Sequence, residues 1–293
     1  MIILCGKEST RYGTFIISLS DRLSMCPGIK GAASPTEKTI WPFAPGRLLW
    51  VELNLPDLDL IKPEELKSLL NEYQMKMNML ATGVYAKTHG LSLSSGIPEE
   101  RMRAVNGCKR NIDYAASMGC GIIIGFLKGG PGSDREVSER LFLESMLELK
   151  PYIEEKKVQV LIEATNHKEA SIIRTLKEGA HVINFLDCPF IQLLADTYHM
   201  NIEEPSLVDS LSEYMNYYPH LHISDDNRAY PGLGSLDFTA IYRKLMECGY
   251  KGTVAVEGNI QHGLLEDTQI CAAYLHKMCS GLHTPSRVPS HAV

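Results

Sequence analysis

The sequence predicts a single α/β domain in which eight strands, each followed by a helix, close into a (β/α)8 TIM barrel. The 293 residues are 44% hydrophobic and 22% charged, which is typical of a globular chain that buries a large core. From Leu49 onward, short apolar runs alternate with longer stretches of helical periodicity, as expected for a parallel sheet whose strands are joined by helices. Such a barrel needs about 250 residues, so the length fits one domain.

Eight apolar, β-prone runs are the expected strands of this barrel. A run near the N-terminus, residues 2–5, opens the set. The others are residues 49–53, 79–85, 121–126, 158–163, 190–196, 220–223 and 253–257. Because the runs recur at intervals close to one strand and helix, they are expected to pair in sequence order.

Helical patterns occupy the gaps between these runs. Pro98, Glu99 and Glu100 are typical of a first helical turn, and Gly119 is typical of a helix end. Similar patterns cover residues 133–155, 168–186, 207–217, 237–248 and 264–279. They complete the helical half of the expected barrel.

Two segments depart from the alternation. Pro27, Pro35, Pro42 and Pro45 break residues 20–48, where the first barrel helix should lie, so this segment is expected to be irregular. Residues 283–293 are polar and contain proline, and they are expected to form a disordered tail. The barrel is therefore expected within residues 1–282.

Composition excludes several classes of partner. The formal net charge is −6 and no long run of Lys and Arg is present, which argues against nucleic acid. No apolar stretch approaches the roughly 20 residues that span a bilayer, and the N-terminus lacks the pattern of a secretory signal. We therefore expect a cytoplasmic protein that does not contact membranes.

Chemistry is expected where polar residues end apolar strands, because these side chains face the mouth of a barrel. Four consecutive runs end this way, at Glu163, Asp196, His222 and Glu257. Successive members are separated by about one βα unit of roughly 30 residues. The four side chains should therefore meet at one rim.

Three carboxylates and an imidazole at one rim would repel one another, and a divalent cation would compensate the charge. An oxygen-rich set with one nitrogen favours Mn²⁺ or Mg²⁺, with Co²⁺ as a further option. A single acid at a strand end more often caps a helix or pairs with an arginine. Four in succession favour a metal site.

The motifs around these four residues resemble those of a known family. They are Glu163-x-x-Asn166, Asp196-Thr197-x-His199, His222-x-Ser224-Asp225 with Asn227-Arg228, Pro231-Gly232-x-Gly234, and Gly249-Tyr250-x-Gly252 before Glu257. Over roughly residues 49–280 the chain resembles the sugar phosphate isomerase/epimerase group of xylose isomerase-like barrels. Within that group it is most similar to ketose 3-epimerases of the tagatose and psicose type.

The resemblance implies an isomerase or epimerase that removes a proton beside a carbonyl and passes through an enediolate. It implies that Glu163, Asp196, His222 and Glu257 hold one divalent metal, and that Glu163 and Glu257 are also the catalytic acid and base. It further implies that His199, Arg228 and Glu169 bind a small sugar substrate. A homo-oligomer is compatible with this group.

Other interpretations remain open. His199 could cap a helix, Arg228 could lie on the surface, and Glu169 could be a solvated helix residue. An inosose-type dehydratase needs the same enediolate, and a non-catalytic sugar-binding barrel is a further alternative. An endonuclease IV-like phosphodiesterase is less favoured, because no histidine follows the runs that end near Thr82 and Gly125. The glycine-rich segments 128–132 and 231–234 are expected to be loops near the ligand.

Overall fold

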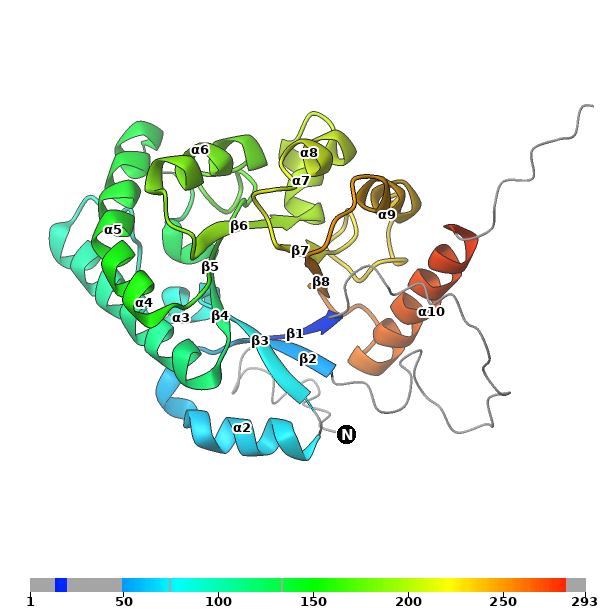
Figure 1. Cartoon of the computed structure of the whole chain (residues 1–293), viewed down its shortest axis with the longest axis horizontal. Helices are drawn as coiled ribbons and strands as arrows, with labels where there is room; N and C mark the ends of the chain where they lie inside the picture. The colour runs from blue at the N-terminus through cyan, green and yellow to red at the C-terminus, as the bar shows by residue number, and fades with distance from the viewer. Residues whose placement is uncertain (1–13, 20–48, 74, 133, 283–293) are drawn as a thin grey trace, which may run out of the picture.

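The protein forms a closed barrel of eight strands that follow one another in sequence order (Figure 1). The computed structural model describes residues 14–19, 49–73, 75–132 and 134–282. The strands are β1 (Thr14–Leu19), β2 (Leu49–Asn54), β3 (Met75–Ala81), β4 (Gly121–Ile124), β5 (Val160–Glu163), β6 (Ile191–Asp196), β7 (His220–Ile223) and β8 (Thr253–Val256). A TIM-barrel sheet is therefore confirmed, with one departure in direction.

That departure is β1, which runs antiparallel to both of its neighbours, whereas β2 to β8 are parallel throughout. No strand was expected at Thr14–Leu19, and the prediction of a wholly parallel sheet is wrong for this strand. Parallel neighbours need a crossover connection, usually a helix, and the prolines of residues 20–48 disfavour one; an antiparallel strand has no such requirement. The expected strand at residues 2–5 and the irregular segment 20–48 lie outside the described residues, as does the tail at 283–293.

Helices cover the outside of the parallel strands (Figure 1). They are α2 (Pro63–Glu72), α3 (Gly83–His89), α4 (Pro98–Met118), α5 (Arg135–Lys156), α6 (Leu176–Leu186), α7 (Thr197–Glu203), α8 (Leu207–Glu213), α9 (Phe238–Glu247) and α10 (Leu264–Leu282), with short 3-10 turns η1 (Leu58–Leu60) and η2 (Phe126–Lys128). Helix α4 ends as predicted, because Gly119 adopts the left-handed conformation with φ +71°. No helix among these is long and apolar enough to cross a bilayer.

Two predicted elements are misplaced. The run 79–85 was expected to be a strand, but β3 begins at Met75 and Gly83 already starts α3. The backbone N–H of Val84 donates to Asn54 Oδ1 (2.8 Å), which ties the start of this helix to the end of β2. The helix expected from residue 168 begins only at Leu176, because the Thr175 side chain accepts from the Glu178 N–H and caps the helix there.

Successive side chains of each strand point alternately outward and inward. This alternation separates two cores and decides which polar side chains at the strand ends point into the barrel. Residues that point outward pack beneath the helices in the larger core. Residues that point inward form a small cluster within the barrel, made of Met79, Ala81, Ile123, Leu161 and Leu194. Since side chains of a strand repeat with a period of two, the residue two positions after an inward leucine also faces inward. Glu163 follows Leu161 and Asp196 follows Leu194 in this way, so both carboxylates lie above the inner core.

Candidate metal and substrate site

The four strand-end residues meet above the inner core. Each of Glu163, Asp196, His222 and Glu257 offers one ligand atom, and these atoms all lie within 4.8 Å of one another. The first three are buried and Glu257 is partly buried. The structure therefore brings together the whole set that the sequence singled out, at a spacing that one cation could bridge.

Glu163 ends β5 and rests against the backbone that follows β4. A Cβ atom added to Gly125 would lie 2.4 Å from Glu163 Oε2, so only glycine leaves room for this carboxylate. Burial, together with the charges of Glu257 and Asp196, raises the pKa of Glu163. In the absence of a cation this carboxylate therefore tends to hold a proton.

Asp196 uses its two oxygens for different purposes. Oδ1 accepts from the N–H groups of Tyr198 (2.8 Å) and His199 (3.3 Å) and caps α7. Oδ2 faces the site, 2.6 Å from Arg228 Nη1 and 3.9 Å from His222 Nδ1. Helix capping and a role as ligand, which the sequence posed as alternatives, are thus compatible in one side chain.

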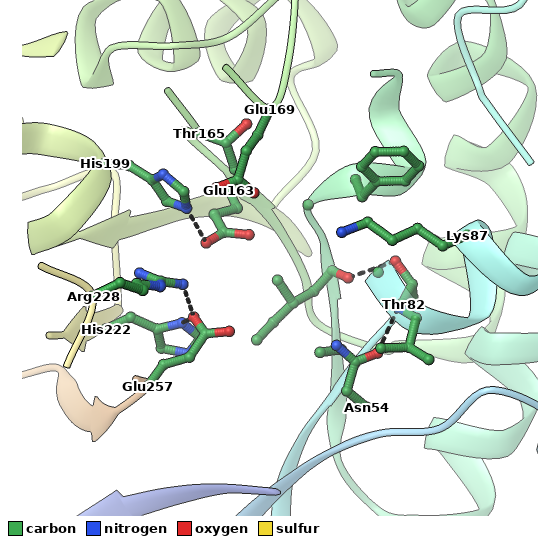
Figure 2. A pocket seen from close by; sticks show the side chains of 16 residues that line it. Asn54, Thr82, Lys87, Glu163, Thr165, Glu169, His199, His222, Arg228 and Glu257 are labelled. Carbon is green, nitrogen blue, oxygen red and sulfur yellow. Dashed lines mark hydrogen bonds and ion pairs between the residues drawn. The ribbon is translucent and has the colours of Figure 1, made fainter. Parts of the chain in front are cut away.

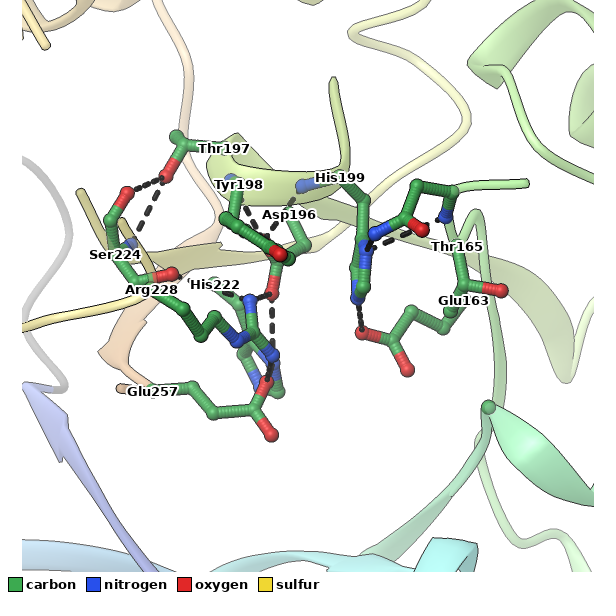
Figure 3. Close-up of polar contacts among 12 residues, drawn as sticks. Glu163, Thr165, Asp196, Thr197, Tyr198, His199, His222, Ser224, Arg228 and Glu257 are labelled. Atoms are coloured by element: carbon green, nitrogen blue, oxygen red, sulfur yellow. Dashed lines mark hydrogen bonds and ion pairs between the residues drawn. The ribbon is translucent and has the colours of Figure 1, made fainter. Parts of the chain in front are cut away.

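Arg228 supplies positive charge at the same place (Figure 3). Its Nη2 donates to Glu257 Oε2 (2.8 Å) while Nη1 donates to Asp196, and its guanidinium lies 5.0 Å from the centre of the Tyr198 ring. Burial alone would raise the pKa of Glu257, but the charges of Arg228 and His222 outweigh it and lower that pKa. Arg228 also has a left-handed backbone with φ +61°, a costly conformation for a residue with a side chain. Its side chain lines the pocket and does not lie on the surface.

His199 is oriented by Asn166. The Asn166 backbone N–H points at His199 Nδ1 (3.3 Å), so this ring nitrogen is the acceptor and Nε2 carries the proton. Nε2 lies 3.6 Å from Glu163 Oε1. Burial lowers the pKa of His199, which favours the neutral ring. His199 therefore presents one N–H to the pocket.

The pocket extends from the four strand ends toward the ends of β2, β3 and β4 (Figure 2). On that far wall lie Asn54, Thr82, Lys87 and Phe126, and the Lys87 ammonium is 4.7 Å from the centre of the Phe126 ring. Glu169 also lines the pocket, although it lies in a turn and is exposed. The pocket thus has an acidic half and a half with amide, hydroxyl and ammonium groups.

Sequence reasoning missed two charged residues next to the site. Glu52 lies inside the barrel on β2 and contacts both His220 and His222. Lys128 is fully buried and its Nζ donates to Thr165 Oγ1 (2.5 Å), two residues after Glu163. A carboxylate within an otherwise apolar strand was a signal for Glu52, whereas the glycines after Lys128 suggested an exposed loop.

Neither glycine-rich loop has the expected place. Among the described residues, those from the end of β4 that line the pocket are Gly125 and Phe126, not residues 129–132. The loop 231–234 is organised around Asp225, whose Oδ2 accepts from the N–H groups of Gly232 and Gly234 (both 2.9 Å). Its backbone donors are therefore directed at Asp225 and not at a ligand.

The four strand-end side chains fit a divalent cation. Their donor set is three carboxylates and one imidazole, which suits hard or borderline ions. With Glu163 ionised, the three carboxylates carry more negative charge than Arg228 alone neutralises, and a bound divalent cation would compensate the rest. At the rim positions after β3 and β4 stand Thr82 and Gly125, which offer no imidazole for a cluster of several zinc ions.

Comparison with known proteins gives a consistent result. The profile of the xylose isomerase-like TIM barrel family matches residues 42–272. D-psicose 3-epimerase of Enterocloster bolteae is 27% identical over 200 residues, which are 66% of this chain and 66% of that protein, just under two thirds of its length. 3-Dehydro-D-guloside 4-epimerase of Escherichia coli is 37% identical over 102 residues, 35% of this chain and 39% of that protein.

Among solved structures, an L-ribulose 3-epimerase superposes with a TM-score of 0.71 at 18% identity, covering 82% of this chain and 89% of that one. At this identity the superposition shows a common fold. The named relatives confirm the resemblance drawn from the sequence motifs.

Proposed function

Because the chain belongs to the xylose isomerase-like TIM barrel family, we propose that it is a divalent-metal-dependent epimerase or isomerase of a small sugar, and specifically a ketose 3-epimerase. The observation that carries this proposal is the meeting of Glu163, Asp196, His222 and Glu257 within 4.8 Å at the mouth of the barrel. An epimerase needs both a charge-stabilising centre and two proton-transfer groups, and these four side chains can provide them.

In this proposal the four side chains hold one Mn²⁺ or Mg²⁺ ion, with Co²⁺ as a further option. When bound, the ion stabilises the negative charge that develops on the substrate oxygen as the neighbouring carbon loses its proton. The guanidinium N–H groups of Arg228 point to the same part of the pocket, and the Nε2–H of His199 is a further donor there. Both groups can hold carbonyl or hydroxyl oxygens of the sugar, and Glu169 can accept from a hydroxyl at the pocket wall.

Glu163 and Glu257 are the proposed acid and base. They come from β5 and from the end of β8 and enter the pocket from different sides (Figure 2). In the metal-free protein their environments shift the two pKa values in opposite directions, upward for Glu163 and downward for Glu257. One carboxylate accepts the proton from a carbon beside the carbonyl, and the other group donates a proton to the opposite face. This sequence inverts the carbon, whereas return to the adjacent carbon would isomerise the sugar.

The test is proton exchange between solvent and substrate. Metal-loaded protein is incubated in D2O with a panel of ketohexoses, ketopentoses and their phosphates, and deuterium at C3 and new epimers are followed by NMR. We expect exchange with at least one ketose that stops when the metal is removed. Absence of metal-dependent exchange over the whole panel would remove the epimerase and isomerase assignments together.

A matched pair of variants tests the proposed base. Glu257→Gln removes the proton acceptor with little change in shape and should lower turnover by about 10² to 10⁴-fold at saturating Mn²⁺. Glu247→Gln, at an exposed position at the end of α9, is the control and should behave like the wild type. Retained turnover in Glu257→Gln would show that its role is misassigned.

A second candidate function is supported by the similarity to 3-dehydro-D-guloside 4-epimerase, which is 37% identical over its matched segment. A 3-keto-glycoside also carries an acidic proton beside a carbonyl, so the same two carboxylates could invert C4. Adding a methyl 3-keto-glucoside to the panel separates the two candidates. Deuterium at C4 of that glycoside without exchange in any ketose would favour the second.

A further inference from the structure

Glu52 lies inside the barrel and contacts two histidines of β7. Its Oε1 is 2.7 Å from His220 Nε2, and its Oε2 is 2.9 Å from His222 Nε2. Asn78 Nδ2 donates to the same Oε1 (3.2 Å). Glu52 has no exposed surface and is absent from the residues that line the pocket, so it does not touch substrate there.

The protons in this network can be assigned by counting donors and acceptors. A carboxylate accepts only, so the hydrogen bond between Glu52 Oε2 and His222 Nε2 requires a proton on that nitrogen. His220 Nδ1 lies 2.5 Å from Thr253 Oγ1, whose hydroxyl can donate to it. His222 therefore donates from Nε2, whereas His220 Nε2 lies close to Glu52 Oε1 without the geometry of a hydrogen bond.

The other nitrogen of His222 faces the Glu257 carboxylate, so by the same count it carries a proton in this structure, which a cation bound there would replace. His222 Nδ1 lies 2.7 Å from Glu257 Oε2 and 3.9 Å from Asp196 Oδ2, on the opposite side of the ring from Glu52. A histidine that ligates a metal needs a fixed tautomer, which is commonly set by a carboxylate on its other nitrogen. Glu52 stands where such a carboxylate is needed.

We propose that Glu52 is a positioning residue for the metal site, which accepts the Nε2 proton of His222 and so presents Nδ1 to the cation held with Glu163, Asp196 and Glu257. This inference rests on the proposed function for the identity of the site. Glu52 acts from β2, which is separated from β7 in the sheet by β1 and β8. His222 is thus fixed from a part of the barrel distant from the other ligands.

Glu52, His220 and His222 could instead hold an ion of their own, since they too offer ligand atoms within 4.8 Å of one another. The contact of His222 favours a hydrogen bond, because its Nε2 lies 2.9 Å from Glu52 Oε2 with the geometry of one. In addition, His222 Nε2 cannot carry a proton and ligate a metal at the same time. A second bound ion is therefore an outcome that the experiment must distinguish.

The experiment measures metal binding and the tautomer of His222, so it does not depend on turnover. Mn²⁺ affinity and stoichiometry are determined by calorimetry for the wild type, for Glu52→Gln and for Glu72→Gln, an exposed control at the end of α2. Gln is uncharged and offers one acceptor and one donor, so it cannot meet both histidines as the two carboxylate oxygens of Glu52 do. We expect one ion per wild-type chain, an affinity 10- to 100-fold weaker in Glu52→Gln, and no change in the control.

A second test needs only the wild-type protein and so does not depend on whether Glu52→Gln folds. It is the ¹⁵N spectrum of the histidine rings in the presence of Mg²⁺. It should show His222 protonated at Nε2 and not at Nδ1. Wild-type affinity in Glu52→Gln, a proton on Nδ1 in the metal-bound wild type, or a second ion lost with Glu52 would each overturn the inference. If the wild type binds no metal at all, the proposed function fails as well, whereas failure of the Glu52 outcomes alone leaves that function standing.

Discussion

Replacing Gly125 with alanine should displace the Glu163 carboxylate while leaving the barrel intact. The added Cβ would lie 2.4 Å from Glu163 Oε2, whereas ordinary contacts begin at 3.4 Å. The carboxylate oxygen must therefore retreat by about 1 Å. It is the far end of a flexible side chain, so this movement costs less than a shift of backbone and the fold should persist.

The size of the expected loss of activity follows from how strictly proton transfer and metal ligation depend on the position of the Glu163 carboxylate. A displacement of about 1 Å at a reacting group can cost on the order of 10²-fold in rate, which corresponds to about 2.7 kcal/mol of activation free energy. Since Glu163 is proposed to act both as ligand and as acid, Gly125→Ala should lower kcat/KM for the best ketose by about 10²-fold or more. The affinity for Mn²⁺ should fall as well.

Gly130→Ala is the matched control in the same segment, because its added Cβ would lie 3.6 Å from the Phe126 ring, an ordinary van der Waals contact. Both variants are assayed for deuterium exchange, Mn²⁺ affinity and thermal unfolding. Equal loss of activity in both variants would point to a general effect on the loop. Wild-type kcat/KM in Gly125→Ala would refute the idea that the position of Glu163 is critical.

Two further predictions concern charge. In metal-free protein the raised pKa of Glu163 means that stability is highest below the ordinary pKa of glutamate, about 4.3, and falls as the pH rises toward the raised value. Urea unfolding should therefore show wild type losing stability relative to Glu163→Gln between about pH 5 and pH 8. Mn²⁺ at about 1,000 times its Kd should add about 4 kcal/mol to the unfolding free energy of the wild type. A stability difference between wild type and Glu163→Gln that does not change with pH would contradict this reasoning. Arg228→Lys should raise KM about tenfold or more, because an ammonium cannot bridge Asp196 and Glu257 as the guanidinium does, and unchanged steady-state kinetics would exclude that role.

The sequence predicted the candidate site best where a candidate ligand stands at the end of a strand. Glu163 and Asp196 each close a short apolar run, and strand alternation together with parallel order was enough to bring them to one rim. His222 and Glu257 followed by the same reasoning. The predicted ligand set could be assembled without knowledge of any distance.

The parts that could not be predicted depend on contacts between distant segments. Glu52 sits within β2 and meets His222 only because the sheet closes through β1, so its partner is invisible in a linear pattern. Lys128 precedes a run rich in glycine, and its burial depends on Thr165 on the neighbouring connection. The misplaced strand at 79–85 has a similar origin, because Val84 and Tyr85 favour strands but Asn54 ties this stretch into a helix.

The reversed direction of β1 has a practical consequence for engineering. Thr14 pairs with Asn54 at the pocket end of β2, and Ser18 pairs with Trp50 near the start of that strand. The chain therefore leaves β1 and enters β2 at the same end of the barrel, opposite the pocket. A surface tether attached at Leu19 or Leu49 would therefore start at the base of the barrel, at the end away from the pocket.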